Sequence, residues 1–159
     1  MIRYREALVS DIPQIMIVRL SVKENVLSDP SLVTQKDNEE YITIRGKGWI
    51  AEINNSIVGF AIADLKEHSI WALFVSPENE GKGIGKTLHG LILNWYFNST
   101  KENVWLTTAA FTRAEKFYKS SGWIEIKREQ KQPSLTTLPD YTEIKLEMSY
   151  DRWHNNKTT

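Results

Sequence analysis

The sequence predicts a mixed α/β (α+β) domain, with a mostly antiparallel sheet of about six or seven strands and about four helices. Three apolar segments joined by short polar turns, within residues 49–75, indicate an antiparallel meander. A glycine-rich loop and an amphipathic segment then precede another apolar segment at 104–109, so we expect a helix to connect two parallel strands. All-parallel doubly wound folds do not have this order of elements.

The N-terminal part predicts one strand and two helices. Residues 2–7 alternate apolar and polar, which is typical of a strand. The pair at 10–11 consists of helix-capping residue types, and the apolar spacing after it predicts a helix that ends at 25–27. A capping-box pattern that begins at Thr34 predicts a second helix over residues 35–45.

The other elements follow from the same patterns. Strands are expected at 49–53, 56–65, 70–75, 104–109, 123–129 and 141–149, and helices at 86–97 and 113–121. Residues 131–140 contain two prolines and predict a loop. Residues 1–150 therefore form one predicted domain, and 151–159 a polar C-terminal tail.

Composition narrows the classes of function. The net charge of the 159 residues is zero, which argues against a nucleic-acid binder because such a protein needs a basic face. The chain has no cysteine, so it has no disulfide and no thiol nucleophile. No apolar stretch is long enough for a membrane span and the N-terminus has no signal core, so we expect a cytoplasmic protein with no membrane partner.

The glycine-rich loop is the strongest chemical signal. A strand, a loop rich in small residues and a helix start together form a device that holds phosphate, because free amides of the first helical turn point at the anion. A P-loop would place a glycine where Glu80 stands, although Gly85, Lys86 and Thr87 match its second half. A dinucleotide fingerprint would place its third glycine at Lys86.

The loop instead resembles motif A of the GCN5-related N-acetyltransferase (GNAT) family, Q/R-x-x-G-x-G/A. Residues 80–85 read EGKGIG, with the two family glycines at Gly83 and Gly85 and a departure at Glu80. A second segment, residues 112–123, is similar to the family's A-x-x-F-Y-x-x-x-G-F/W pattern. Two motifs separated by one strand make the resemblance specific over about half of the chain, whereas the N-terminal half matches in element order only.

The resemblance implies that the protein binds acetyl-CoA and transfers the acetyl group directly to a primary amine. The implied contacts with coenzyme A are Gly81, Lys82, Gly83, Ile84, Gly85, Lys86 and Thr87. Arg113 is a further candidate contact, and a solvated arginine is the alternative for it.

In this family the central strand splays away from its parallel neighbour, and the pantetheine arm fills the gap. By position, Phe74 and Val75 would pair with that arm, and the Val75 amide would stabilise the oxyanion of the thioester. Tyr118 would donate a proton to the leaving thiolate. The alternative for Tyr118 is simple packing on the apolar face that it shares with Phe117.

The general base is left open by the sequence. Some family members use a strand glutamate, but Ser69 stands at the matching position. Glu24 is one candidate, acting through water, because it lies with Arg19 and Asn25 at the polar end of the first predicted helix, which borders the acceptor cleft in this fold. A solvated helix face is an equal alternative. His68 is another candidate, but it stands in a predicted turn, and a surface histidine is the preferred interpretation.

Two tryptophans and the absence of a metal pattern complete the predicted site. Trp71 could line the acceptor pocket, and Trp49 is expected in the core. No histidine and carboxylate cluster has metal-ligand spacing, so no metal is predicted.

The acceptor and the oligomeric state stay open. A small-molecule amine, a peptide amine and a protein amine all remain possible acceptors, and the family often forms homodimers. The alternative functions are a non-catalytic module that binds acyl-CoA and, on Gly85-Lys86-Thr87 alone, a small nucleotide-triphosphate enzyme.

Overall fold

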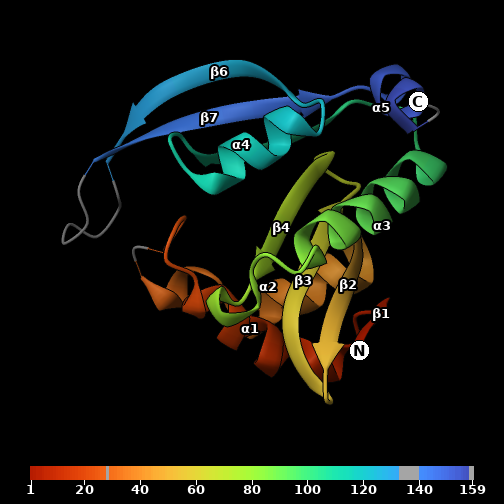
Figure 1. Ribbon diagram of the computed structural model, residues 1–159, viewed down its shortest axis with the longest axis vertical. Helices are drawn as coiled ribbons and strands as arrows, with labels where there is room; N and C mark the ends of the chain where they lie inside the picture. The colour runs from red at the N-terminus through yellow and green to blue at the C-terminus, as the bar shows by residue number, and fades with distance from the viewer. Residues whose placement is uncertain (28, 133–139, 158–159) are drawn as a thin grey trace.

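The computed structural model describes residues 1–27, 29–132 and 140–157. Its seven strands form one sheet in the order β1-β2-β3-β4-β5-β7-β6, mostly antiparallel, as the sequence predicts (Figure 1). The strands are β1 Ile2–Glu6, β2 Gly46–Ile53, β3 Ser56–Asp64, β4 Ser69–Val75, β5 Val104–Ala109, β6 Ile124–Lys131 and β7 Tyr141–Met148.

Helices cover both faces of the sheet. The α-helices of the described residues are α1 Ile12–Ser21, α2 Gln35–Glu40, α3 Ile84–Ser99, α4 Arg113–Ser120 and α5 Tyr150–Lys157. On one face, α1 packs its buried Ile12 and Ile15 against Phe60 of β3. On the other face, α3 packs Leu88 against Ala61, which neighbours Phe60 in the same strand. Alternate residues of one strand thus serve two separate cores.

The sheet opens between its two parallel strands. β4 and β5 are paired at a single position, Ser69 with Trp105, whereas β5 and β7 are paired along all of β5. Beyond this pair no residue of β4 is paired with β5 in the described chain, so the two strands diverge. This divergence is the predicted splay, and it leaves one edge of each strand available to other partners.

Helix α1 ends earlier than the sequence predicts. The expected end at 25–27 is wrong, because α1 stops at Ser21 and Asn25 has a φ of 58°. Asn25 bonds across the molecule instead: its Oδ1 accepts from the Ala109 amide at 2.8 Å, and its Nδ2 donates to Thr108 Oγ1 at 3.0 Å. Tertiary bonds to β5 therefore override the helical spacing that continues to Val26.

The second predicted helix is divided. Its start is confirmed, with the Thr34 hydroxyl accepting from the Asp37 amide at 3.1 Å, but the α-helix ends at Glu40. A wider π-helical turn follows over Tyr41–Arg45, and β2 begins at once with Gly46. The Cβ of any other residue at Gly46 would lie 1.7 Å from the carbonyl oxygen of Ala63, so this glycine permits close strand pairing.

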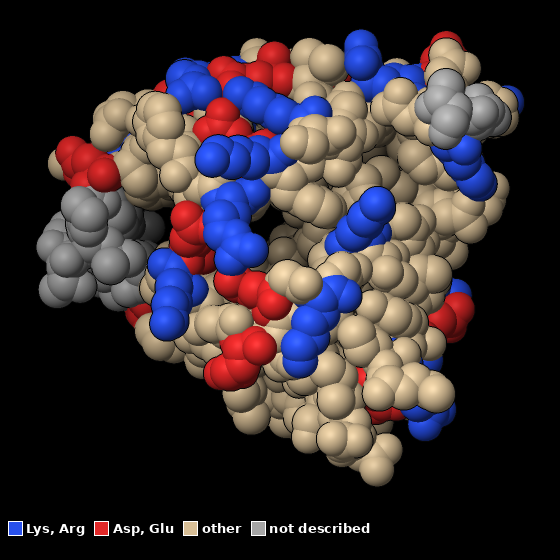
Figure 2. Space-filling model, viewed as in Figure 1, with Lys and Arg blue, Asp and Glu red and all other residues tan. Residues whose placement is uncertain are grey.

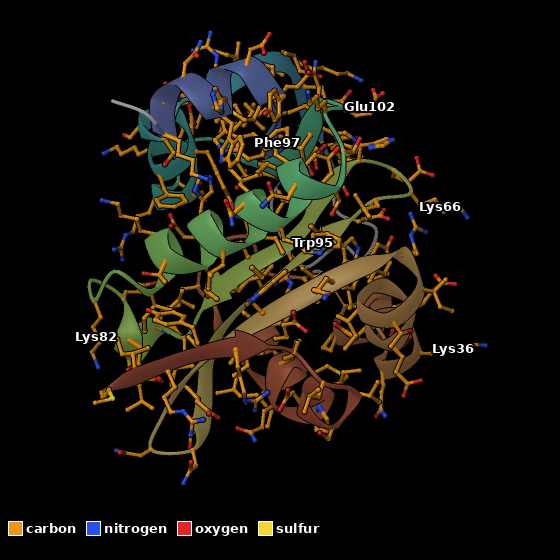
Figure 3. All side chains as sticks on the ribbon, turned by 90° about the vertical axis from the view of Figure 1, so that its right-hand side faces the viewer. Lys36, Lys66, Lys82, Trp95, Phe97 and Glu102 are labelled. Atoms are coloured by element: carbon orange, nitrogen blue, oxygen red, sulfur yellow. The ribbon has the colours of Figure 1, made fainter. Side chains whose placement is uncertain are left out.

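The predicted polar tail at 151–159 is a helix over its described part. In α5, Trp153 stacks on Phe97 of α3 at 5.0 Å between ring centroids, and Figure 3 shows Phe97 between these helices. The residues of α5 are mostly polar, so the sequence pattern did not indicate that Trp153 packs against α3. Of the predicted loop at 131–140, residues 133–139 lie outside the described residues. No helix in the described part of the chain has the length and apolar character needed to span a bilayer.

Candidate functional site

The glycine loop lies between β4 and the start of α3. Gly81 and Gly83 have φ values of 79° and 80°, in the left-handed region that glycine adopts without strain. A Cβ at either position would meet no atom within 4 Å, so the loop presents bare backbone to open space. Gly83 is the N-cap of α3, and Lys82 extends from the outer end of the loop, where its Nζ donates to Asn79 Oδ1 at 2.9 Å (Figure 3).

The start of α3 provides free amides next to this open space. An α-helix leaves its first amides without intrahelical acceptors, and its dipole makes that end positive. Ile84, the first helical residue, is buried and holds the helix end against the sheet. The Thr87 amide already donates to the Gly83 carbonyl at 3.1 Å, so the amides of Ile84, Gly85 and Lys86 are the ones that remain for an anion.

Strand alternation decides which β4 groups face the splay. The Ser76 amide donates to the Val58 carbonyl on β3 at 2.8 Å, so the preceding amide, that of Val75, points to the opposite edge, toward the gap. Phe74 stands two residues before Ser76, so its backbone groups point the same way as the Ser76 amide, toward β3. Of the two predicted positions, Val75 therefore directs its backbone groups toward the gap and Phe74 does not; Leu73, two residues before Val75, faces the gap in its place.

The opposite wall of the gap is the free edge of β5. At one end the Trp105 amide donates to the His68 carbonyl at 3.0 Å, and at the other end Asn25 accepts from Ala109. Between these closed ends lies a cavity of about 730 Å³. Its lining includes Leu73 and Phe74 of β4, Thr107 of β5 and Tyr118 of α4. The surface is hollowed at the centre of the face in Figure 2, with basic and acidic side chains around the opening.

Tyr118 borders this cavity and is 6% exposed. Its hydroxyl has no hydrogen-bond partner among the described residues, and burial raises its pKa above the usual value, so the phenol stays protonated at neutral pH. The predicted position of Tyr118 at the cofactor cleft therefore agrees with the structure. Phe117 packs edge-on against His89, in line with its predicted role.

His89 lies under the Tyr118 ring and was not singled out by the sequence. Its Nε2 accepts from the Trp123 indole N–H at 2.9 Å, and its ring centroid is 6.1 Å from that of Tyr118. Burial lowers the pKa of His89 to about 4, so the ring is neutral at pH 7. In the sequence, His89 is marked only by its place directly after Leu88, a buried residue of α3. Its burial depends on packing with Trp123, which lies 34 residues away in the sequence.

Glu24, the candidate base, does not line the cavity. Its Oε1 accepts from the Arg113 amide at 3.1 Å, so this carboxylate lies at the N-terminus of α4. His68 Nδ1 lies 3.0 Å from the Tyr96 hydroxyl and is also outside the cavity lining. Trp71 does line the cavity, where it stacks on Tyr41 with ring centroids 3.9 Å apart. Trp49 packs against the α3 core.

Glu80 and Arg113 form an ion pair that joins the glycine loop to α4. Both side chains are well exposed. The arginine partly neutralises the carboxylate at the departure from motif A, beside the free amides at the start of α3. The pair places the Arg113 side chain next to the glycine loop, with 68% of that side chain exposed to solvent.

Comparisons with known proteins agree with this geometry. A model of the "Acetyltransferase (GNAT) family" matches residues 16–123. No match is found among curated proteins. Among solved structures, the ribosomal-protein-S18-alanine N-acetyltransferase of Escherichia coli is similar, with a TM-score of 0.78 and 17% identity over 94% of each chain.

Two further solved structures resemble the chain in the same way. An N-acetyltransferase of Staphylococcus aureus Mu50 has a TM-score of 0.78 and 13% identity over 94% of this chain and 99% of that one. The YncA protein of Salmonella typhimurium, solved with its cofactor acetyl-CoA, has a TM-score of 0.75 and 14% identity over 94% of each chain. At such identities the structures show a shared fold. Together with the match over residues 16–123, they show that the chain belongs to the GNAT family of acetyltransferases.

Proposed function

We propose that this protein is an acetyl-CoA-dependent N-acetyltransferase that transfers the acetyl group directly to a primary amine. The observation that carries the proposal is the open gap between β4 and β5. It has the Val75 amide, oriented by strand alternation, on one edge. Its lining includes Leu73 and Phe74 of β4 and Tyr118 of α4, and β4 continues through Val75 toward the glycine loop and the start of α3, which lie outside that lining.

The residues present fit coenzyme A. The bare backbone at Gly81 and Gly83 leaves room for a pyrophosphate, and the free amides of the first α3 turn are its natural donors. The unpaired backbone edge at Leu73 and Val75 suits the amide groups of a pantetheine arm, which can add to the sheet as a strand does. Bound acetyl-CoA supplies an acyl thioester.

The chain's own residues then have defined tasks. The Val75 N–H is directed to donate to the thioester oxygen as negative charge develops there. When the amine nitrogen bonds to the carbonyl carbon and the carbon–sulfur bond breaks, the Tyr118 O–H gives its proton to the sulfur, a role supported by the position of Tyr118 in the cavity lining. The amine loses a proton in the same reaction. Glu24 accepts from the Arg113 amide at the N-terminus of α4, and Glu143 of the cavity lining lies 4.0 Å from Lys131, so water is the proposed carrier of this proton.

The experiment is a turnover assay with purified protein, acetyl-CoA and a panel of primary amines. Released thiol is measured with a chromogenic reagent, and the acetylated amine is identified by mass spectrometry. The proposal expects thiol release that depends on one amine and matches the acetylated product in amount. Tight binding of acetyl-CoA with no acetylation of any amine would favour the non-catalytic module.

A further inference from the structure

Arg19 is the one residue of the described chain that has a buried side-chain nitrogen without a hydrogen-bond partner. Its Nη1 is sealed from solvent, and no carboxylate of the described residues lies within ion-pair distance of its guanidinium. The residues outside the described ranges include no aspartate or glutamate. The guanidinium lies over the Phe74 ring but has no anion beside it, and a partly buried charge without an anion is costly, so an anionic partner from outside the chain would stabilise it.

Arg19 lies on the other face of the sheet from the glycine loop. Its guanidinium carbon lies 4.0 Å from the centroid of the Phe74 ring, and both side chains line the cavity. Phe74 packs with the core under α1, whereas Val75 packs with the core under α3, where the glycine loop begins. Arg19 therefore reaches the cavity from the face opposite to the loop, on the side of the gap that is left for the acceptor.

The charge of this cavity wall favours an anion. Among its lining residues the cations are Arg19, Lys23 and Lys131, and the one carboxylate is Glu143. Lys131 is already paired, with Glu129 at 3.0 Å and Glu143 at 4.0 Å. Burial lowers the pKa of Arg19 to about 10, which still leaves the guanidinium charged at neutral pH. The field of these cations also favours the neutral, nucleophilic form of an amine nearby.

Apolar side chains surround the same entrance. Leu20, Val26 and Leu32 all line the cavity and are about half exposed, at 50%, 49% and 50%. Trp71 adds a flat aromatic wall held in place by Tyr41. An apolar group of a ligand would cover this surface, which is otherwise left to water.

We propose that the acceptor is a small amine that carries a carboxylate, with Arg19 as the residue that binds this carboxylate and with an apolar group of the acceptor against Trp71 and the leucines at the rim. The planar fork of arginine binds a carboxylate through two parallel hydrogen bonds, and because Nη1 is sealed while Arg19 as a whole is only partly buried, Nε and Nη2 are the proposed donors. An apolar amino acid has all three parts. This assignment rests on the proposed function, since it presumes that the amine is the acetyl acceptor.

The test compares L-phenylalanine with L-phenylalaninamide, which differ in the carboxylate and keep the amine and the ring. Each is titrated by calorimetry into the protein saturated with coenzyme A. We expect the amino acid to bind at least about tenfold more tightly than the amide. Arg19→Gln should remove that difference by weakening the amino acid and leaving the amide within about twofold. Arg19→Lys keeps the charge and loses the planar fork, so its preference for the amino acid over the amide should lie between those of the native chain and Arg19→Gln.

Two further variants control for folding and for charge in general. Arg152→Gln removes an exposed arginine of α5 and should leave both affinities unchanged. Arg19→Met keeps the length of the side chain and removes the buried charge, so its melting temperature should equal or exceed that of the native chain. A lower melting temperature for Arg19→Met with unchanged ligand preference would show a structural role and overturn the proposal.

The remaining outcomes are also decisive. Equal affinity for amino acid and amide in the native chain, tighter binding of the amide, or no binding of either probe would contradict the assignment of Arg19. Failure of coenzyme A to bind is seen in a separate titration and would count against the proposed function. The two probes can then be titrated into the free protein, where Arg19 is still present.

Discussion

The two sides of the cleft present different kinds of binding group, backbone amides on one side and side chains on the other. On the side of α3, the candidate cofactor site consists of backbone amides held by Gly81, Gly83 and the first helical turn. On the side of α1, the candidate acceptor site consists of side chains, with Arg19 and Trp71 among them. A backbone site needs special residues at fixed spacing and so leaves a motif, whereas a side-chain site is formed by residues that are distant in sequence.

The first and largest prediction concerns the backbone side. Gly83→Val forces a β-branched residue into a φ of 80° and places carbon atoms in the open space beside the free amides. Affinity for acetyl-CoA should fall about 100-fold or more by calorimetry.

The matched control is Gly90→Ala. Gly90 lies within α3 with no atom within 4 Å of its would-be Cβ. Alanine there should stabilise the protein by about 0.5–1 kcal/mol and leave cofactor affinity unchanged. An equal loss of affinity in both variants would mean that the effect comes from α3 as a whole.

The second prediction concerns His89 of α3, which packs next to Tyr118 and Trp123. With its pKa lowered to about 4, the folded chain binds fewer protons at this residue than the unfolded chain, whose histidine titrates near 6.5. Stability contributed by the neutral ring is therefore complete above pH 6.5 and is lost as the pH falls toward 4. Urea unfolding should show a loss of about 2 kcal/mol from this residue between pH 7 and pH 5.

His89→Gln keeps an acceptor for the Trp123 N–H and removes the titration. The difference in unfolding free energy between pH 7 and pH 5 should shrink in this variant by the same amount. An unchanged difference would mean that His89 can be protonated in the folded state.

The third prediction separates binding from chemistry at the gap. Tyr118→Phe should lower turnover about tenfold or more and leave acetyl-CoA affinity nearly unchanged, because the hydroxyl acts on the leaving sulfur.

Tyr96→Phe is the control, since this buried tyrosine donates to the Asn103 carbonyl at 3.2 Å, away from the cavity. It should cost about 1 kcal/mol of stability with normal turnover per folded molecule. Normal turnover in Tyr118→Phe would remove that residue from the mechanism.

The fourth and smallest prediction concerns the ion pair between the loop and α4. Glu80→Gln removes a negative charge beside the phosphate-binding amides and releases Arg113, so acetyl-CoA affinity should rise about threefold at low salt. The gain should shrink at high salt.

Glu102→Gln, at the far end of α3 in Figure 3, serves as the control for charge alone. Weaker binding in Glu80→Gln would mean that the carboxylate orients the loop.

The sequence predicted the sheet and the positions of both motifs, because glycine spacing and strand alternation are local properties. The splay between β4 and β5 was expected from the resemblance to the family. It did not predict that α1 stops at Ser21, since the end is determined by Asn25 bonding to β5, 83 and 84 residues away. Nor did it predict α5, whose packing depends on Phe97 and Trp153 meeting across the fold.

At the site, the different orientations of Val75 and Phe74 also depend on contacts between strands, which the sequence pattern does not show. Position alone suggested both backbones, and the register with β3 was needed to show that only Val75 and its alternate neighbour Leu73 face the gap. The role of Arg19 depends on burial and on absent partners, which no spacing pattern records. Glu24 shows the opposite error. Its sequence position suggested a place at the acceptor cleft, but its carboxylate binds the Arg113 amide at the N-terminus of α4.

The most direct test of the central claim is to follow backbone amides by NMR while acetyl-CoA is added. The account predicts saturable binding with the largest shifts at Val75, Gly83, Gly85 and Lys86, and small shifts at the sheet edge formed by β1. No binding at millimolar acetyl-CoA, or shifts gathered away from the gap between β4 and β5, would contradict it.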